Sequence, residues 1–386
     1  MNQTFDRPPI WYRIKPIFQG FDWPLMMIIV FMCTLGLVTM YSAGYDNGSR
    51  FGDQSRNMAL AALVMFVVAQ VPPQRLMALA VPLYVVGVVL LILTAIPHVG
   101  ITKKGATRWL NIGMVIQPSE ILKIATPLML AWWFQRREGH RSPHDFLIAG
   151  GLLLLPVAMI LKQPDLGTAM LVMTSGLYVL FFAGLSWRLI VPVVVAGALG
   201  ITALVLSEEK ICQPEVSWVG LHDYQKNRVC TLLDPTKDPL GKGFHIIQGM
   251  IAIGAGGVSG KGYMKGTQTH LEFIPERTTD FIFAAYSEEF GLLGGLTLLG
   301  GFLALIFRGL ILASQAPTLF SRLLAGSLSL SFFTYAFVNM GMVSGILPVV
   351  GVPLPFISYG GTAMVTLGLA LGMLMSIAKS RGLMQR

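Results

Sequence analysis

The residue types best suited to chemistry gather in one acidic stretch, LEFIPERTTDFIFAAYSEEFG, which runs from Leu271 to Gly291. Five of its residues are carboxylates, although only 12% of the whole chain is charged. Asp280 is the last carboxylate before the apolar run that starts at Phe281. A carboxylate at the mouth of a membrane helix is costly unless it is solvated, paired or used, so Asp280 is the leading candidate for a catalytic residue. The alternative is that it only caps the helix that follows.

The other charges of this stretch have different expected roles. Glu276 and Arg277 precede Asp280 in the loop, and we expect them to shape that loop or to contact a substrate. Glu288 and Glu289 follow about two helical turns later. A carboxylate at that depth needs a partner or a cavity, so these two are expected to organise the helices around them.

A second charged pair lies in the sequence QPSEILK, residues 117–123. Pro118 suits the first turn of a helix. Glu120 and Lys123 are three residues apart and therefore share one helix face. They can pair inside the membrane, which offsets part of the cost of burying either charge. A structural ion pair and a direct catalytic role both fit this pattern.

Several cations are candidates for binding an anionic group. The loop ITKKGATRWLNIG carries Lys103, Lys104 and Arg108, which suit either a pyrophosphate-binding rim or a solvated loop. The glycine-rich run GAGGVSGKGYMKGTQ departs from the phosphate-loop pattern, because Gly262 rather than Ser or Thr follows Lys261. It is typical of a flexible hinge, and a phosphate contact through Lys261 is the weaker alternative.

Two further segments complete the candidate site. In QPDLGT, Asp165 is a preferred N-cap residue, and we favour a capping role over a catalytic one. The run GILPVVGVPLPFISYGGT, residues 345–362, has no charge but carries three prolines and Ser358. Irregular backbone near membrane depth is tolerated where it is buried in protein or lines a cavity, so this loop is expected to form part of a site wall.

The composition indicates that membrane helices position these residues. The 386 residues are 54% hydrophobic, and their mean hydropathy is +0.66. Several stretches reach the roughly 18 apolar residues needed to cross a bilayer core. We therefore expect an all-α, polytopic membrane protein of about ten transmembrane helices with one large external loop. The expected spans are 23–43, 57–73, 77–98, 117–135, 146–162, 166–184, 188–207, 280–307, 322–343 and 358–380.

The positions of Lys and Arg orient these spans. Thirteen basic residues flank the side that carries both termini, and six lie on the short opposite loops. The positive-inside rule makes residues 1–22 a cytoplasmic segment and 381–386 a cytoplasmic tail. The membrane domain is then 23–380, with 208–279 as its large external loop. The net charge of +9 reflects this topology and an anionic lipid substrate rather than nucleic-acid binding.

The three cysteines fall in two different settings. Cys33 lies in the first span and is expected to be a small packing residue. Cys212 and Cys230 both lie in the external loop, 18 residues apart. A disulfide is open to them in an oxidising compartment, and two free thiols are the equal alternative.

Together these segments resemble the SEDS family of membrane peptidoglycan polymerases. The resemblance rests on QPSEILK, QPDLGT, LEFIPERTTDFIFAAYSEEFG and GILPVVGVPLPFISYGG, which follow the family's order and extend over essentially the whole chain. The sequence Gly266-Thr267-Gln268 and the PVVGVPLPF form of the last loop are similar to RodA-type rather than FtsW-type members. Thr278 stands where the family often has His, which leaves Asp280 in register with the family's catalytic aspartate.

The resemblance implies a lipid II polymerase of cell elongation. Such an enzyme transfers a growing glycan from its undecaprenyl pyrophosphate carrier to the sugar hydroxyl of another lipid II. It implies Asp280 as the general base on that hydroxyl. Substrate-binding or supporting roles are then expected for Glu120, Lys123, Arg108, Lys103, Lys104, Asp165, Lys261, Glu276, Arg277 and Ser358.

The resemblance also implies a multi-pass protein of the cell inner membrane whose active site faces the periplasm. The expected partners are a class B penicillin-binding protein, which crosslinks the product, and elongation-complex proteins, together with lipid II and membrane lipid. No cofactor is expected, no His/Cys metal cluster is visible, and a divalent cation requirement stays open. A lipid II transporter or flippase, and a non-catalytic scaffold of the elongation machinery, are the alternative functions.

Overall fold

The computed structural model describes residues 20–46, 48–96, 99–103, 106–111, 115–139, 142–213, 216, 223–234, 241–271, 273–274 and 276–384. These residues are mostly helical. The long helices are α2 (Trp23–Ala43), α3 (Gly48–Ala69), α4 (Pro73–Thr94), α5 (Pro118–Gln135), α6 (Pro143–Lys162), α7 (Leu166–Phe182), α8 (Trp187–Leu206), α13 (Ile282–Ser314), α14 (Leu319–Val343) and α15 (Gly361–Met384). The short ones are α9 (Glu208–Ile211), α10 (Asp223–Leu233), α11 (Lys242–Gly256) and α12 (Thr267–His270).

Many of these helices have the length and composition of membrane spans. Among the described residues, seven are long and apolar enough to cross a bilayer: α2, α4, α6, α8, α13, α14 and residues 361–380 of α15. The chain is therefore an integral membrane protein. Each predicted span overlaps one long helix, and the span predicted at 23–43 coincides with α2. The Asp22 side chain caps this helix by accepting a hydrogen bond from the Leu25 amide, which fixes where it begins.

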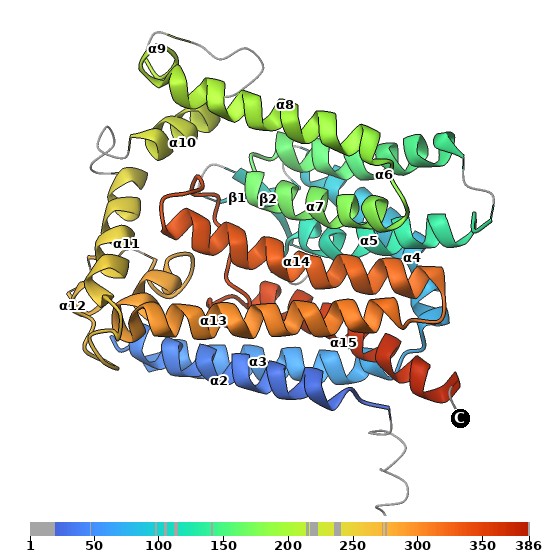
Figure 1. The fold of residues 1–386 in the computed structure, drawn as a ribbon, viewed down its shortest axis with the longest axis horizontal. Coiled ribbons are helices and arrows are strands. Elements are labelled where there is room, and N and C mark those ends of the chain that lie inside the picture. The colour runs from blue at the N-terminus through green and yellow to red at the C-terminus, as the bar shows by residue number, and fades with distance from the viewer. Residues whose placement is uncertain are drawn as a thin grey trace, which may run out of the picture.

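The long helices lie side by side in one bundle, with α5 and α14 in its interior (Figure 1). Helix α5 packs on α4, α7 and α14, while α14 packs on α13 and α7. Leu122, Leu128 and Phe134 of α5 are fully buried. This packing brings Glu120 and Lys123, which belong to the same helix, into the interior of the protein.

The segment between α8 and α13 gathers at one end of the bundle. Helices α9 to α12 lie there, and the end of α15 lies at the opposite end (Figure 1). Helix α11 packs against α13. A disulfide joins Cys212, directly after α9, to Cys230 in α10.

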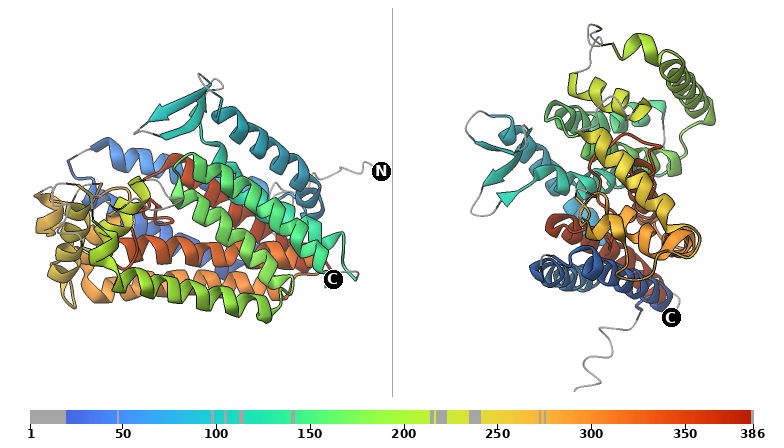
Figure 2. Two further views of the ribbon diagram at one scale, coloured as in Figure 1. Left: turned by 90° about the horizontal axis from the view of Figure 1, so that it is seen from above. Right: turned by 90° about the vertical axis from the view of Figure 1, so that its left-hand side faces the viewer.

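The loop between α4 and α5 differs from the all-α expectation. It forms an antiparallel sheet of strands β1 (Gly100–Lys103), β2 (Ala106–Asn111) and β3 (Val115–Ile116), in the order β1-β2-β3. Its β-branched and aromatic residues favour strand over coil. Figure 2 shows the sheet projecting from one side of the bundle, beside α4. The fold class is therefore helical with a small external sheet.

Helix α8 lies at the edge of the bundle (Figures 1 and 2). Each of its twenty described residues, Trp187–Leu206, is exposed or half-buried. In a membrane protein such a surface faces lipid. An apolar segment in lipid forms a helix because its backbone groups must pair with one another, so α8 does not depend on contact with other helices.

Helix α13 is broken in its first third. Gly291 has φ 63° and ψ −159°, a backbone conformation that is essentially restricted to glycine. The segment Gly257–Gly262 lies against the break and satisfies the freed backbone groups. Its amides at 261 and 262 donate to the carbonyls of 288 and 289 at 3.0 Å, and its carbonyls at 257 and 258 accept from the amides of 292 and 293. The break therefore leaves these backbone groups paired, as membrane depth requires.

This break predicts opposite effects for two glycines of the same helix. Gly291→Ala should destabilise the protein by at least about 2 kcal/mol, because its φ is unfavourable for alanine. A Cβ there would also lie 2.3 Å from the Gly260 nitrogen. The control is Gly295→Ala, where a Cβ meets nothing within 4 Å. It should be neutral or slightly stabilising. Thermal unfolding in detergent measures both, and equal midpoints would contradict the strained geometry at Gly291.

Candidate active site

Asp280 ends a turn of residues 276–280 that leads directly into α13. The N-cap residue of α13 is Phe281, which makes no side-chain capping hydrogen bond. Phe281 is buried against Ala252 and Met342 and so anchors the start of the helix by packing. The N-cap position of α13 therefore falls on Phe281 and not on Asp280, and Asp280 is half-buried just before it.

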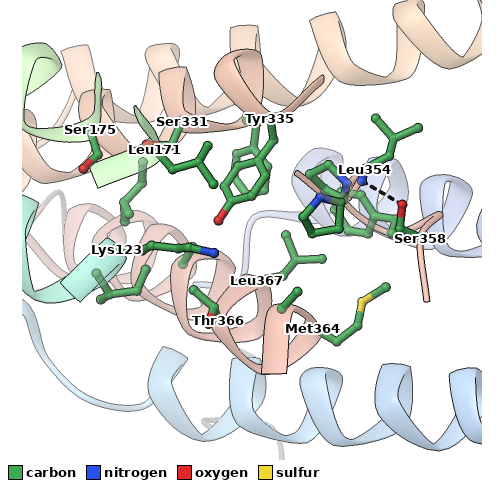
Figure 3. Close-up of a pocket in the computed structure, with 18 residues that line it drawn as sticks. Lys123, Leu171, Ser175, Ser331, Tyr335, Leu354, Ser358, Met364, Thr366 and Leu367 are labelled. Carbon is green, nitrogen blue, oxygen red and sulfur yellow. Dashed lines mark hydrogen bonds between the residues drawn. The ribbon is translucent and has the colours of Figure 1, made fainter. Parts of the chain in front are cut away.

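The turn before Asp280 is held by the last loop. The Tyr359 amide donates to the Thr278 carbonyl at 2.9 Å, and Ser358 Oγ donates to the Thr279 carbonyl at 2.7 Å. Ser358 Oγ also accepts a hydrogen bond from the Leu354 amide at 2.8 Å, which Figure 3 shows. One serine hydroxyl therefore fixes its own loop and the turn that carries Asp280.

A buried amide holds Asp280 itself. Asn339 Nδ2, from α14, donates to the Asp280 carbonyl at 3.0 Å and to the Val352 carbonyl at 2.7 Å. Beside it, Gly351 has φ 73°, and a Cβ added to it would lie 3.4 Å from Asp280 Oδ2. The last loop thus comes into contact distance of the Asp280 carboxylate.

The same loop lines a pocket between α5, α14 and α15 (Figure 3). Its polar lining residues include Lys123, Tyr335, Thr366 and Ser358, and residues 353–356 supply an apolar wall. The loop therefore lines a cavity, and its place in the wall of the active site stays a prediction. Ser358 belongs both to the pocket lining and to the hydrogen bonds that hold the turn of Asp280.

The charged pair predicted on α5 forms at the edge of this pocket. Lys123 Nζ lies 2.6 Å from Glu120 Oε1, and Thr366 of α15 donates to Glu120 Oε2 at 3.0 Å. Lys123 is only 7% exposed and lies 5.6 Å from the ring centre of Tyr335. The Tyr335 hydroxyl points toward the Lys123 side chain across the pocket (Figure 3). The pair therefore links α5 to α15 and also presents an ammonium group to a cavity.

Arg108 has a structural position rather than a place in an open rim. Its guanidinium donates to the carbonyls of Gln163 and Pro164 and lies 3.7 Å from Asp165 Oδ1. Asp165 accepts from the Thr168 amide, so it caps α7 as expected. These bonds attach the external sheet to the turn between α6 and α7.

Lys261 likewise serves the structure. Its ammonium lies 2.7 Å from Glu288 Oε1 and donates to Thr267 Oγ1. Glu288 is 0% exposed and accepts further hydrogen bonds from the amides of Gln268 and Thr269. Glu288 therefore anchors α12 to α13, and the ammonium of Lys261 is already paired.

The end of α2 is tied to the acidic stretch by two contacts. Ser42 donates a short hydrogen bond to Glu289 of α13. The Arg277 guanidinium donates to the Ala43 carbonyl at 3.0 Å and lies 2.6 Å from Asp46 Oδ2. The hydrogen bond from Arg277 lowers the pKa of the Asp46 carboxyl below its usual range. Arg277 therefore shapes the loop, which was one of its two expected roles.

The remaining predicted residues lie further out. Glu276 is exposed, and its carboxylate accepts a hydrogen bond from Thr279 Oγ1 at 2.9 Å within the turn. Lys103 lies on β1, and Lys104 lies outside the described residues.

Four contributors to the site were missed by sequence reasoning: Asn339, Gln54, Tyr335 and Thr366. Gln54 is fully buried, and its Nε2 donates to the Ser358 carbonyl at 3.1 Å. The sequence did contain a signal for Asn339, since an amide inside an apolar helix is unfavourable unless it makes hydrogen bonds. Gln54 lay ahead of the predicted second span, so its burial could not be inferred.

The chemistry that this arrangement suits is proton transfer at the end of the bundle. A half-buried carboxylate lies on one side of the last loop, and a buried ammonium faces a pocket on the other. In the part of the chain that the structure describes, no three His, Cys, Asp or Glu side chains converge as a metal site would require. A carboxylate held by its backbone in this way is suited to the role of a general base.

Comparison with known proteins gives one consistent family. Residues 23–382 match the family described as cell cycle protein, FtsW/RodA/SpoVE. The peptidoglycan glycosyltransferase MrdB of Escherichia coli (strain K12) is 46% identical over 367 residues, 95% of each chain. RodA of Treponema pallidum (strain Nichols), also a peptidoglycan glycosyltransferase, is 32% identical over 95% of this chain and 99% of its own.

Solved structures give the same result. A chain in the structure of a peptidoglycan synthase complex that coordinates polymerization and crosslinking aligns with TM-score 0.76 and 32% identity, over 94% of this chain and 98% of that one. The crystal structure of the rod shape determining protein RodA of Thermus thermophilus aligns with TM-score 0.68 and 28% identity, over 94% and 97%. The similarity therefore extends over nearly the full length in sequence and in fold.

The buried pair on α5 predicts a strong dependence on both partners. Lys123→Met or Glu120→Gln should each cost about 3–5 kcal/mol of stability, because each leaves a buried charge unpaired. The exposed pair Arg56–Asp53 has the same three-residue spacing and provides the control. Arg56→Met should cost at most about 1 kcal/mol.

Thermal unfolding of the purified variants measures these costs. Exchange of the two charges, Glu120→Lys with Lys123→Glu, should recover part of the loss, since Thr366 Oγ can accept as well as donate a hydrogen bond. A Lys123 variant as stable as the Arg56 variant would show that the pair does not support the fold. If the exchange restores stability but not activity, one of the two residues has a direct role.

Proposed function

This chain belongs to the FtsW/RodA/SpoVE family, the SEDS peptidoglycan glycosyltransferases, and from that premise we propose that it polymerises lipid II with Asp280 as the general base. The protein is a peptidoglycan glycosyltransferase, as its relatives are. The observation that carries the assignment of Asp280 is its position. It lies at the start of α13, in a turn whose carbonyls at residues 278, 279 and 280 are each held by a hydrogen bond from another element.

The proposed reaction begins at the carboxylate of Asp280. The Asp280 carboxylate takes the proton of a sugar hydroxyl on the acceptor lipid II. The hydroxyl oxygen then attacks the anomeric carbon of the growing glycan, a new carbon–oxygen bond forms, and the bond to the pyrophosphate oxygen breaks. Undecaprenyl pyrophosphate leaves with that electron pair. Cations near the leaving group stabilise the charge that develops on it.

The structure changes which cations suit this second role. Arg108, Lys261 and Arg277 are engaged in structural contacts. Arg50 of α3 places its guanidinium 4.7 Å above the ring of Tyr359, in the loop that holds the turn of Asp280. We assign the pyrophosphate contact to Arg50 in the first place. Lys103 and Lys104 remain the further candidates, because lysine ammonium groups are common partners of phosphate oxygens.

We infer that this chemistry lies outside the cytoplasm. We infer about ten crossings of the cell inner membrane, both termini in the cytoplasm, residues 208–279 as a large periplasmic loop and the active site facing the periplasm. Two observations support this orientation. The turn of Asp280 and α9–α12 lie at the end of the bundle opposite the end of α15 (Figure 1). The basic residues concentrate on the side that carries the termini.

We expect a crosslinking partner for this polymerase. The aligned structure is a peptidoglycan synthase complex that couples polymerization to crosslinking. We propose a class B penicillin-binding protein as the corresponding partner of this chain, within the elongation machinery. Lipid II transport without chemistry is the competing function, since it also needs a cavity for an anionic lipid.

The general-base assignment predicts the effect of one substitution. Asp280→Asn should lower turnover by about 10²- to 10⁴-fold, because the amide cannot accept the proton. The substrate is purified lipid II, and the product is measured as glycan polymer formed by the protein with its transpeptidase partner. Asp53→Asn, the same substitution on the exposed start of α3, is the matched control and should retain turnover within about twofold.

Two results would overturn this assignment. Full turnover of Asp280→Asn would remove Asp280 from the mechanism. Absence of polymer from the folded wild-type complex, together with lipid II movement across vesicles, would favour transport.

The orientation predicts a thiol-labelling pattern in intact cells. In a Cys33→Ser background, a membrane-impermeant maleimide should label neither Cys212 nor Cys230 until an impermeant reductant is added, and should then label both. The reason is that an oxidising periplasm keeps the disulfide that joins them. Labelling before reduction would show free thiols, and absence of labelling after reduction would place the loop in the cytoplasm.

A further inference from the structure

Asn339 is a buried amide that neither composition nor a motif explains. It lies on α14, in the apolar sequence FVNMGMV, and is 0% exposed. Burying an amide at membrane depth is unfavourable unless its hydrogen bonds are satisfied. Its Oδ1 has no hydrogen-bond partner among the described residues. The hydrogen bonds of this side chain that the structure shows are therefore those that its Nδ2 donates.

The donor side joins two segments that meet at the site. Both hydrogens of Nδ2 are used, one on the Asp280 carbonyl at 3.0 Å and one on the Val352 carbonyl at 2.7 Å. Val352 follows Gly351, whose backbone lies beside the Asp280 carboxylate. One side chain therefore sets the distance between the residue with the reactive carboxylate and the loop that faces it.

Ser358 makes the matching bond one residue earlier. Its Oγ holds the Thr279 carbonyl, and its own carbonyl accepts from Gln54 Nε2 of α3. Gln54 is fully buried, and its Oε1 has no partner in the described part of the chain. Two buried amides, each with an unpaired oxygen, thus support the same turn from α14 and from α3.

We propose that Asn339 is a positioning residue for Asp280, acting through the Asp280 backbone together with Ser358, with Gln54 behind Ser358. This inference rests on the proposed function of Asp280. Fixing the carbonyls on both sides of the Asp280 nitrogen and Cα restricts rotation of the peptide planes. The Cα–Cβ bond of Asp280, which carries the carboxylate, then points in one direction relative to Gly351 and the last loop.

This role has a specific kinetic consequence. Asn339 touches no substrate in this account, so its loss leaves substrate binding nearly unchanged. It displaces the base from the hydroxyl that it must deprotonate, and a displacement of about 1 Å can cost about 100-fold in rate. Loss of Asn339 should therefore lower kcat and kcat/KM by the same factor.

The test is Asn339→Leu, which keeps the side-chain volume and removes both donors. We expect kcat to fall by about 30- to 100-fold with KM changed by less than about threefold, in polymerisation of lipid II by the complex. The matched control is Ser327→Ala on the same helix. Ser327 is equally buried and donates to the Ser175 carbonyl of α7, so the control also removes a buried interhelical bond. It should keep kcat within about twofold.

The outcomes separate positioning from general stability. Asn339→Leu with kcat within twofold of wild type, or a loss no larger than that of Ser327→Ala, would overturn the proposal. If Asn339→Leu does not fold, Ser358→Ala replaces it. This variant removes the bond to the Thr279 carbonyl, together with the bond from the Leu354 amide, and should lower kcat about tenfold at unchanged KM. Wild-type kcat in that variant would also overturn the proposal.

The same assay distinguishes this inference from the proposed function. Wild type and Asp280→Asn are measured alongside. If wild type and Asn339→Leu polymerise lipid II equally well while Asp280→Asn does not, only the positioning role of Asn339 is rejected. If Asp280→Asn and Asn339→Leu both keep full activity, Asp280 is not the general base and the positioning role of Asn339 is rejected with it.

Discussion

The hydrogen bonds on the carbonyls of residues 278–280 connect three parts of the chain that are distant in sequence. Tyr359 and Ser358 bind from the last loop and Asn339 from α14, while the turn itself begins α13. Because backbone groups near membrane depth must be paired inside the protein, these bonds fix how α13, α14 and the last loop meet. The position of Asp280 follows from that junction.

The same requirement explains why several charges serve the fold. The break at Gly291 frees backbone groups in α13, and the segment 257–262 pairs with them. Lys261 then lies beside Glu288, and each offsets the burial of the other. Arg108 meets the same need at the turn between α6 and α7. Cations that looked available for a phosphate are therefore already in use.

The last loop brings the two candidate regions of chemistry together. Its residues 353–356 and Ser358 line the pocket that contains Lys123, and Gly351 lies against Asp280. A carboxylate at the end of the bundle and a buried ion pair thus share one structural wall. Substitutions in this uncharged, proline- and glycine-rich loop can therefore affect both Asp280 and the pocket that contains Lys123.

The sequence alone determined the membrane class, the approximate helix positions, the pairing of Glu120 with Lys123, the cap at Asp165 and the family register of Asp280, because these depend on hydropathy, short spacings and motifs. Only the tertiary structure decided the rest. Whether Arg108 and Lys261 were free cations, and whether Asn339 and Gln54 mattered, depended on contacts with residues up to 304 positions away. Such contacts leave no periodicity in the chain. The sheet after α4 was missed for a related reason, because short exposed strands carry a weak signal beside strongly apolar helices.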